Sequence, residues 1–64
     1  MYTLKKVLEL VNVGEDIYCE LYRTDRFINE GWLSDLDLES DTNIEMSRMD
    51  HDVNGDETLI LFLA

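Results

Sequence analysis

The chain has 64 residues, of which 15 are Asp or Glu and five are Lys or Arg, so its formal net charge is -10. A chain of this length forms one domain, residues 1–64, with a small core, because short chains bury only about 60% of their unfolded surface. The negative charge disfavours direct binding to nucleic acid or to a membrane surface, since both need Lys and Arg. Disorder is also disfavoured, because 45% of the residues are hydrophobic and they fall in periodic segments.

The single cysteine, Cys19, cannot close an internal disulfide, which favours a reducing compartment, the cytoplasm. Cys19 lies in an apolar stretch, and we expect a small buried side chain rather than a reactive thiol. No segment has the basic-then-apolar pattern of a signal peptide. The longest apolar run, Leu59 to Ala64, is too short to span a bilayer.

Residues 3–12 are expected to form a short amphipathic helix. Its apolar residues follow the i, i+3, i+4, i+7 spacing of one helical face, as Leu4, Val7, Leu8 and Val11. Thr3 is the expected N-cap, and Asn12 and Gly14 are expected to end the helix.

Residues 16–24 and 27–33 are expected to form two antiparallel strands with a tight connection at residues 24–26, because apolar and polar side chains alternate in the first. Gly31 in the second strand indicates a bulge or the close approach of another group. Ser34 is then a candidate cap for one or two helical turns over residues 34–39, whose first turn carries acids.

Residues 43–53 and 56–63 predict a hairpin around Asn54-Gly55, because Asn-Gly tolerates the positive φ angles of a two-residue type I′ turn. This turn would pair His51 with Thr58 and Met49 with Ile60. The second strand is apolar on both faces, which is typical of a covered central strand.

The predicted fold is therefore α+β, with an N-terminal helix packed on a small antiparallel sheet of about four strands that ends in a C-terminal β-hairpin. The helix covers one face of the central strand. A second copy of the chain could cover the other.

The hairpin sequence matches the first half of an EF-hand calcium loop, with Asp50, Asp52, Asn54, Gly55 and Asp56 in the ligand pattern. The second half departs from it, because Glu57 occupies an apolar position and Leu61 replaces the bidentate Glu. We expect an acidic turn and no metal or other cofactor. His51 has no catalytic motif around it, and we expect no enzymatic activity.

The acidic residues are concentrated in one part of the chain. Residues 1–26 carry five acids and four bases, whereas residues 27–64 carry ten acids and one base, Arg48. Crowded like charges destabilise a compact chain, so a basic partner is the plainest reason to keep them. Acids two positions apart on a strand project the same way about 6.6 Å apart, an interval comparable to that of a sugar–phosphate strand. A solvated acidic surface and adaptation to a salty cell are the alternatives.

The expected partner-binding residues are acids from two regions and one aromatic anchor. Trp32 lies close to several acids, and an aromatic residue with a polar rim is typical of an interface anchor. Core packing or a dimer interface is the alternative for the aromatic side chains, above all Tyr18 and Tyr22. The predicted contact set is Asp35, Asp37, Glu39, Asp41, Asp50, Asp52, Asp56, Glu57 and Trp32.

The order of the segments TLKKVLELV, IYCELYR, GWLSDLD and NIEMSRMDHDVNGDETLILFL resembles that of short helix-plus-sheet proteins encoded by bacterial phages and other mobile elements. In size and acidity the chain is also similar to anti-CRISPR proteins and other phage inhibitors that imitate DNA. The resemblance implies a non-enzymatic inhibitor in a bacterial host cell. Its partner would be a basic nucleic-acid-binding host protein, such as a CRISPR effector complex. Because that group shares a strategy and not a fold, no residue roles are carried over from it.

Two other functions stay open. One is a small structural or regulatory interaction module that dimerises through its sheet and its apolar C-terminal strand. The other is a nucleotide-binding or cation-binding protein, although the net charge disfavours a nucleotide pocket.

Overall fold

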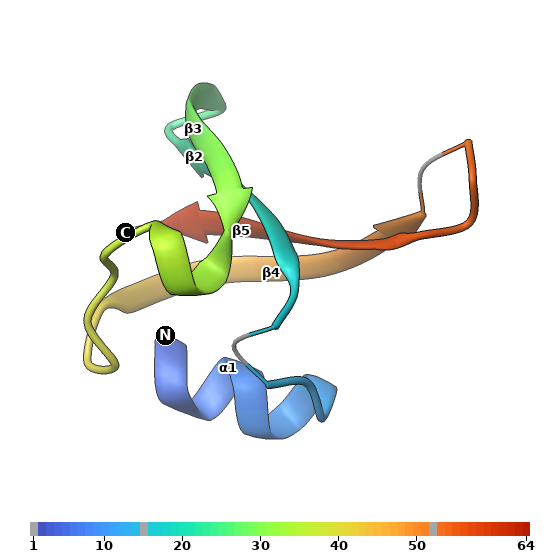
Figure 1. Cartoon of the computed structure of the whole chain (residues 1–64). Helices are drawn as coiled ribbons and strands as arrows, with labels where there is room; N and C mark the ends of the chain where they lie inside the picture. The colour runs from blue at the N-terminus through green and yellow to red at the C-terminus, as the bar shows by residue number, and fades with distance from the viewer. Residues whose placement is uncertain (1, 15, 52) are drawn as a thin grey trace.

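A computed structural model describes residues 2–14, 16–51 and 53–64. Its elements in chain order are β1 (Tyr2–Thr3), α1 (Leu4–Val11), β2 (Tyr18–Arg23), β3 (Arg26–Trp32), the 3-10 helix η1 (Leu33–Asp35), β4 (Asn43–His51) and β5 (Glu57–Leu63). The strands form one five-stranded sheet in the order β1-β4-β5-β2-β3 (Figure 1).

The predicted α+β class with an N-terminal helix is confirmed, whereas an antiparallel sheet of about four strands is wrong in its details. The sheet is mixed, because β5 pairs antiparallel with β4 and parallel with β2. The additional strand, β1, is two residues long and pairs with the start of β4. The central position of β5 in the sheet explains why its sequence is apolar on both faces.

Both ends of α1 are fixed by the residues expected to cap it. The Thr3 hydroxyl accepts a hydrogen bond from the Lys6 amide at 3.3 Å, which satisfies one free donor of the first turn. Asn12 adopts the left-handed conformation with a φ of 57°, and its amide donates to the Leu8 carbonyl. Asn tolerates this conformation better than most residues, so the helix stops there.

The hydrophobic core lies on one face of the sheet, and α1 and η1 both contribute to it. Its buried members are Leu4, Val7, Ile17, Cys19, Leu21, Leu33, Ile44, Leu59, Leu61 and Leu63. The expectation that Cys19 is buried is confirmed, since its side chain has 0% exposure. Burying a Leu or Ile side chain contributes roughly 1.5–3 kcal/mol, so this single layer supplies most of the favourable free energy of folding.

The register predicted for the β4–β5 hairpin is wrong by one residue. His51 pairs with Glu57 and Met49 with Leu59, so five positions, 52–56, separate the paired ends instead of the two of a type I′ turn. A one-residue shift moves every side chain of a strand to the other face. Because β5 is apolar on both faces, the sequence pattern does not fix the register. The observed register turns the partly buried Met49 toward the core.

One of the two predictions around η1 needs correction. Ser34 is not the cap, because η1 begins at Leu33 and its N-cap, Trp32, makes no side-chain capping hydrogen bond. Leu33 is buried, and this burial fixes the start of the turn one residue earlier. The close approach expected at Gly31 is confirmed, since a Cβ there would lie 3.4 Å from Leu36 Cδ2. The bulge of β3 falls instead at Ile28, between the pairs of Asn29 and Phe27.

Candidate functional site

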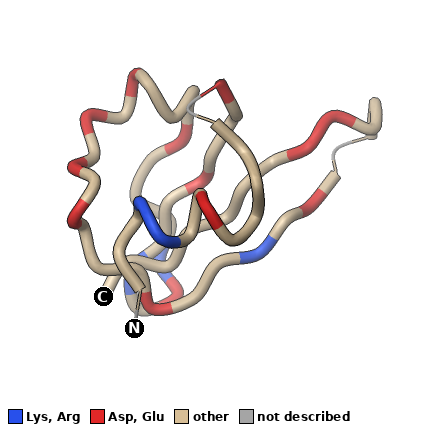
Figure 2. The backbone as a smooth tube through the Cα atoms, turned by 90° about the horizontal axis from the view of Figure 1, so that it is seen from below, with Lys and Arg blue, Asp and Glu red and all other residues tan. Residues whose placement is uncertain are grey.

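The predicted contact acids occupy two regions at opposite ends of β4. One region is residues 35–41, from the last residue of η1 to the segment before β4, and the other is the β4–β5 hairpin, which extends away from the rest of the chain (Figures 1 and 2). Because β4 has nine residues, its ends are separated by about 26 Å at roughly 3.3 Å per residue. The two acidic regions therefore do not form one continuous row of charges.

The segment between η1 and β4 is held against the N-terminal end of α1. The Leu4 amide donates to the Thr42 carbonyl at 2.8 Å, and the Lys5 amide donates to the Ser40 carbonyl at 2.9 Å. Apolar side chains of this segment pack on the core, while the acids of residues 35–41 are all exposed: Asp35, Asp37, Glu39 and Asp41. The ion pairs formed between described residues, Lys6–Glu9 and His51–Glu57, involve none of these four acids.

The hairpin carries the second group of exposed acids. Asp50 Oδ1 accepts a hydrogen bond from the His51 amide at 2.8 Å, and Glu57 Oε1 lies 3.9 Å from His51 Nε2. Asp56 is exposed and lies immediately before β5. Asp52, which the sequence also placed in the contact set, lies outside the described residues.

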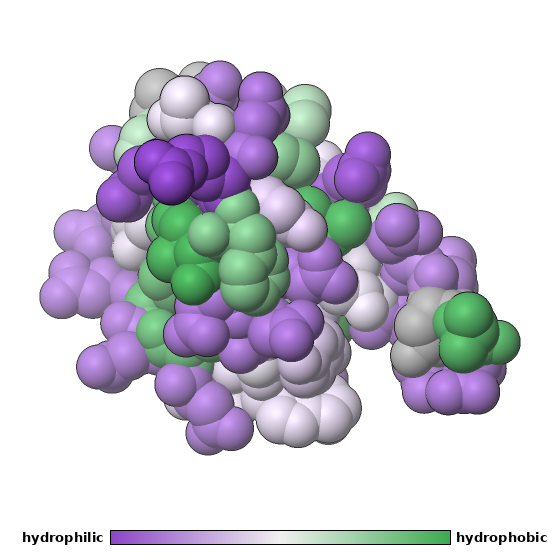
Figure 3. All heavy atoms as spheres, turned by 90° about the horizontal axis from the view of Figure 1, so that it is seen from above, coloured by the Kyte–Doolittle hydropathy of each residue, from purple (hydrophilic) through white to green (hydrophobic). Residues whose placement is uncertain are grey.

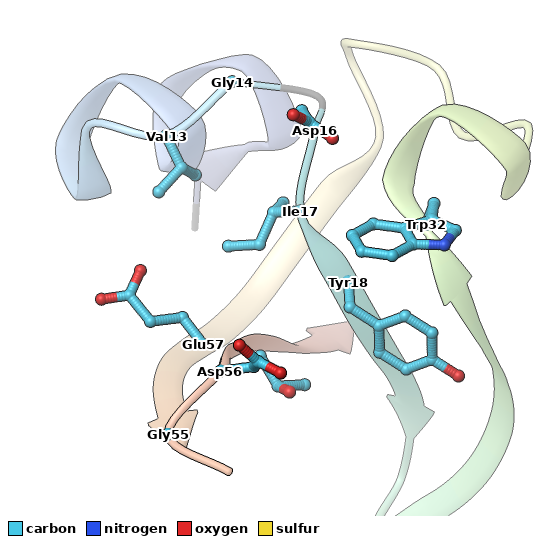
Figure 4. Close-up of a pocket in the computed structure, with 10 residues that line it drawn as sticks. Val13, Gly14, Asp16, Ile17, Tyr18, Trp32, Gly55, Asp56 and Glu57 are labelled. Atoms are coloured by element: carbon cyan, nitrogen blue, oxygen red, sulfur yellow. The ribbon is translucent and has the colours of Figure 1, made fainter. Parts of the chain in front are cut away.

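Three of the predicted contact residues, Trp32, Asp56 and Glu57, line the same groove (Figure 4). The groove has a volume of about 930 Å³ and opens between the hairpin, the start of β2 and the connection that follows α1. Its described lining consists of Val13, Gly14, Asp16, Ile17, Tyr18, Trp32, Gly55, Asp56, Glu57 and Thr58, a set without Lys or Arg. Three carboxylates thus border one concave surface.

One wall of the groove is aromatic. The rings of Tyr18 and Trp32 meet edge to face, with centroids 5.6 Å apart and planes at 88°. The indole is 52% exposed and is therefore available to a ligand. Partial burial raises the pKa of the Tyr18 hydroxyl above its ordinary value, and the charges of Glu30 and Glu20 raise it further.

Strand pairing explains why these residues meet. The antiparallel pairing of β2 with β3 sets Tyr18 opposite Trp32, and the parallel pairing of β2 with β5 sets Tyr18 opposite Thr58. Asp16 precedes β2 and Asp56 precedes β5. Because these two strands are parallel, both carboxylates lie at the same end of the sheet. The groove is a product of the parallel β2–β5 pair.

The chain matches no protein-family model, and the search of curated proteins and of solved structures gave no match. The case for a function therefore comes from the geometry of the chain itself. No α-helix within the described ranges is long and apolar enough to cross a membrane. Those ranges also contain no group of three or more His, Cys, Asp or Glu side chains arranged to hold a metal ion.

The groove combines the two features that attract an organic cation. Carboxylates supply negative charge, and an exposed indole or phenol supplies the negative face of an aromatic ring. Sequence reasoning found Trp32, Asp56 and Glu57 but missed Asp16 and Tyr18 as members of the site. Nothing local to these two residues indicates a site, because only the pairing of β2 with β5 brings them to the others.

Proposed function

We propose that this protein is a non-enzymatic binding module whose hairpin end binds a basic, nucleic-acid-binding surface of another protein. The observation that carries the proposal is the groove in which Asp16, Asp56 and Glu57 lie with the Tyr18–Trp32 pair. The resemblance to phage inhibitors adds the class of partner, a Lys/Arg-rich host protein such as a CRISPR effector complex.

Arginine suits this groove better than lysine. Its planar guanidinium can stack on the indole of Trp32 and donate hydrogen bonds to a carboxylate such as Glu57 at the same time. A lysine ammonium is a compact and strongly hydrated charge that gains less from an aromatic surface. Lys/Arg-rich nucleic-acid sites present both residues, and arginine would provide the anchor.

The separation of the two acidic regions restricts the proposed contact surface to one end of the molecule. A mimic of one continuous nucleic-acid strand needs evenly spaced charges on a single face, and the acids of the η1–β4 segment lie at the far end of β4. The groove and the hairpin therefore form the contact surface, and the acids between η1 and β4 contribute long-range attraction.

The proposal is tested with an arginine-rich labelled peptide and a lysine-rich peptide of equal charge, measured by fluorescence anisotropy. We expect the arginine peptide to bind more tightly and both affinities to fall as salt rises. The variant D16N/E57Q should weaken binding by roughly tenfold or more, because two groove charges are lost.

The matched controls separate the groove from net charge. D35N/E39Q removes two charges from residues 35–41, and we expect it to bind almost as tightly as the native chain. Trp32→Ala should weaken arginine binding, whereas Phe27→Ala, which removes an equally exposed ring outside the groove lining, should not. Equal losses in D16N/E57Q and D35N/E39Q would show that only net charge matters, and the groove would then have no part in binding.

A second measurement addresses the nucleic-acid-binding character of the partner. A Lys/Arg-rich nucleic-acid-binding domain is loaded with a labelled duplex, and the chain is titrated into the complex. We expect the duplex to be displaced by the native chain and not by D16N/E57Q. Binding of the peptides without displacement of the duplex would leave a basic-peptide binder and exclude competition with nucleic acid.

A further inference from the structure

The face of the sheet opposite the core carries a regular array of large side chains. The pairing registers set these side chains in three rows that cross β4, β5, β2 and β3 in that order. The first row is Met46, Phe62, Tyr22 and Phe27. The second row is Arg48, Ile60, Glu20 and Glu30. The third row is Asp50, Thr58, Tyr18 and Trp32.

Contacts within the array confirm that these side chains share one face. Tyr22 stacks on Phe62 with ring centroids 5.3 Å apart and meets Phe27 edge to face at 5.8 Å. The Tyr22 hydroxyl donates to Glu20 Oε1 at 2.8 Å. These contacts order the aromatic side chains before any partner arrives, which lowers the entropy cost of binding.

The array is open at its corners. Met46, Phe27 and Trp32 are 53%, 55% and 52% exposed, and Asp50 is also exposed, while Ile60 in the middle row is buried by its neighbours. In the view from above, with β2 and β3 nearest the viewer, exposed apolar atoms gather in an area that hydrophilic atoms surround (Figure 3). Exposed apolar and aromatic side chains of the outer rows thus flank a charged middle row of Arg48, Glu20 and Glu30.

We propose that this face binds a second copy of the chain, with Arg48 of each copy opposite Glu30 of the other. Stacked sheets keep their strands within about 30° of each other, so a twofold axis can lie along the strands or across them. An axis along the strands, between β5 and β2, places β4 of one copy over β3 of the other. Each of the three rows then faces the same row of the other copy.

The charges of the middle row select between the two axes. With the axis along the strands, Arg48 opposes Glu30, Met46 opposes Phe27 and Phe62 opposes Tyr22. With the axis across the strands, each middle-row residue opposes the same residue of the other copy, so Arg48 meets Arg48 and Glu30 meets Glu30. Like charges at an interface cost several kcal/mol, and the axis along the strands is therefore favoured.

This dimer goes beyond the proposed function, but its third row contains Tyr18 and Trp32 of the groove wall, so a second copy and the proposed ligand compete for these two rings. Because each row faces the same row of the other copy, the hairpins and grooves of both copies lie at the same end of the dimer. The array spans about 14 Å by 13 Å between Cα atoms, from roughly 4.8 Å between strands and 3.3 Å along them. This area is smaller than the roughly 800 Å² per partner of a standard interface, so we expect a weak and reversible dimer.

Sedimentation of the native chain should show concentration-dependent dimerisation in the micromolar range. Arg48→Glu and Glu30→Arg should each weaken it by roughly tenfold or more, because each variant alone places like charges opposite one another twice. An equimolar mixture of the two variants should dimerise again, since each copy then offers what the other lacks. Circular dichroism checks that the variants are folded, as expected for two exposed positions.

If net charge alone governed dimerisation, the variants would rank differently in how strongly they dimerise. Arg48→Glu takes the net charge from -10 to -12 and Glu30→Arg takes it to -8, so general repulsion alone would make Glu30→Arg the best dimer of all. Arg26→Glu, which makes the same charge change outside the array, is the control and should dimerise almost as the native chain does. A native chain that stays monomeric, single variants that dimerise normally, or a mixture that does not recover would each overturn the proposed face. A dimer insensitive to these charges would point to edge pairing through β3 instead.

Discussion

The thiol of Cys19 shows what complete burial does to a single reactive group. Burial raises its pKa from the ordinary value of 9.0 to about 11, and its Sγ donates a weak hydrogen bond to the Ile17 carbonyl at 3.8 Å. A raised pKa in the folded state means that the thiol's contribution to stability is complete below pH 9.0. That contribution is lost as the pH rises toward 11, because the unfolded thiol ionises first.

We therefore expect Cys19 to react with a thiol reagent such as DTNB only after the chain unfolds. At mildly alkaline pH the labelling rate should increase with denaturant in parallel with the unfolded fraction. C19A/S40C moves the thiol to an exposed loop position and should be labelled at once. Labelling of the native chain at the rate of this control would contradict the burial of Cys19.

The turn between β2 and β3 concentrates backbone strain in two adjacent residues. Thr24 and Asp25 have φ angles of 53° and 61°, the left-handed pair of a type I′ turn. A β-branched residue such as Thr is poorly suited to this conformation, whereas Asn and Gly adopt it readily. The chain places its one Asn-Gly pair in the five-residue β4–β5 connection, where Gly55 has a φ of 83°.

We expect T24N/D25G to raise the free energy of unfolding by roughly 1–2 kcal/mol, because the strain at the two positions is removed. Chemical denaturation followed by circular dichroism measures the change. Thr24→Val keeps the branched Cβ and should be no more stable than the native chain. A double variant as stable as the native chain, or less so, would show that the turn is unstrained.

Local patterns predicted the elements of this chain better than their pairing. The caps at Thr3 and Asn12 and the alternation in β2 each depend on neighbouring residues, and these predictions are confirmed. The parallel pairing of β2 with β5 joins segments about 40 residues apart, and no local pattern encodes it. The hairpin register failed for a related reason, because β5 is apolar on both faces and accepts either register.

For the candidate site too, single residues could be predicted from the sequence, whereas their assembly into one groove could not. Trp32, Asp56 and Glu57 stood out by residue type and position in the chain, so they could be singled out one by one. That they share a groove with Asp16 and Tyr18 depends on the strand order. The separation of the two acidic regions likewise follows from the length of β4, which only the fold reveals.

The whole molecule carries its excess charge over a small volume. Its dimensions are 30 × 25 × 19 Å, whereas exposed charges are screened beyond about 10 Å at 0.1 M salt. Repulsion between the two ends of β4 is therefore weak at moderate salt. Most of the destabilisation arises inside each region, above all among the four acids of residues 35–41, which lie within seven residues.

We therefore expect sodium chloride to raise the free energy of unfolding, by about 1 kcal/mol between low and moderate salt. D37N/E39Q should be more stable than the native chain at low salt. It should lose this advantage as salt is added, because salt then screens the same repulsion between carboxylates that the substitutions remove. Asn keeps the left-handed backbone of residue 37, whose φ is 58°, so the change is one of charge alone there. K5Q/K6Q removes two bases instead and should lower stability at low salt. If D37N/E39Q gained the same stability at every salt concentration, the gain would come from local backbone preference and not from relief of repulsion.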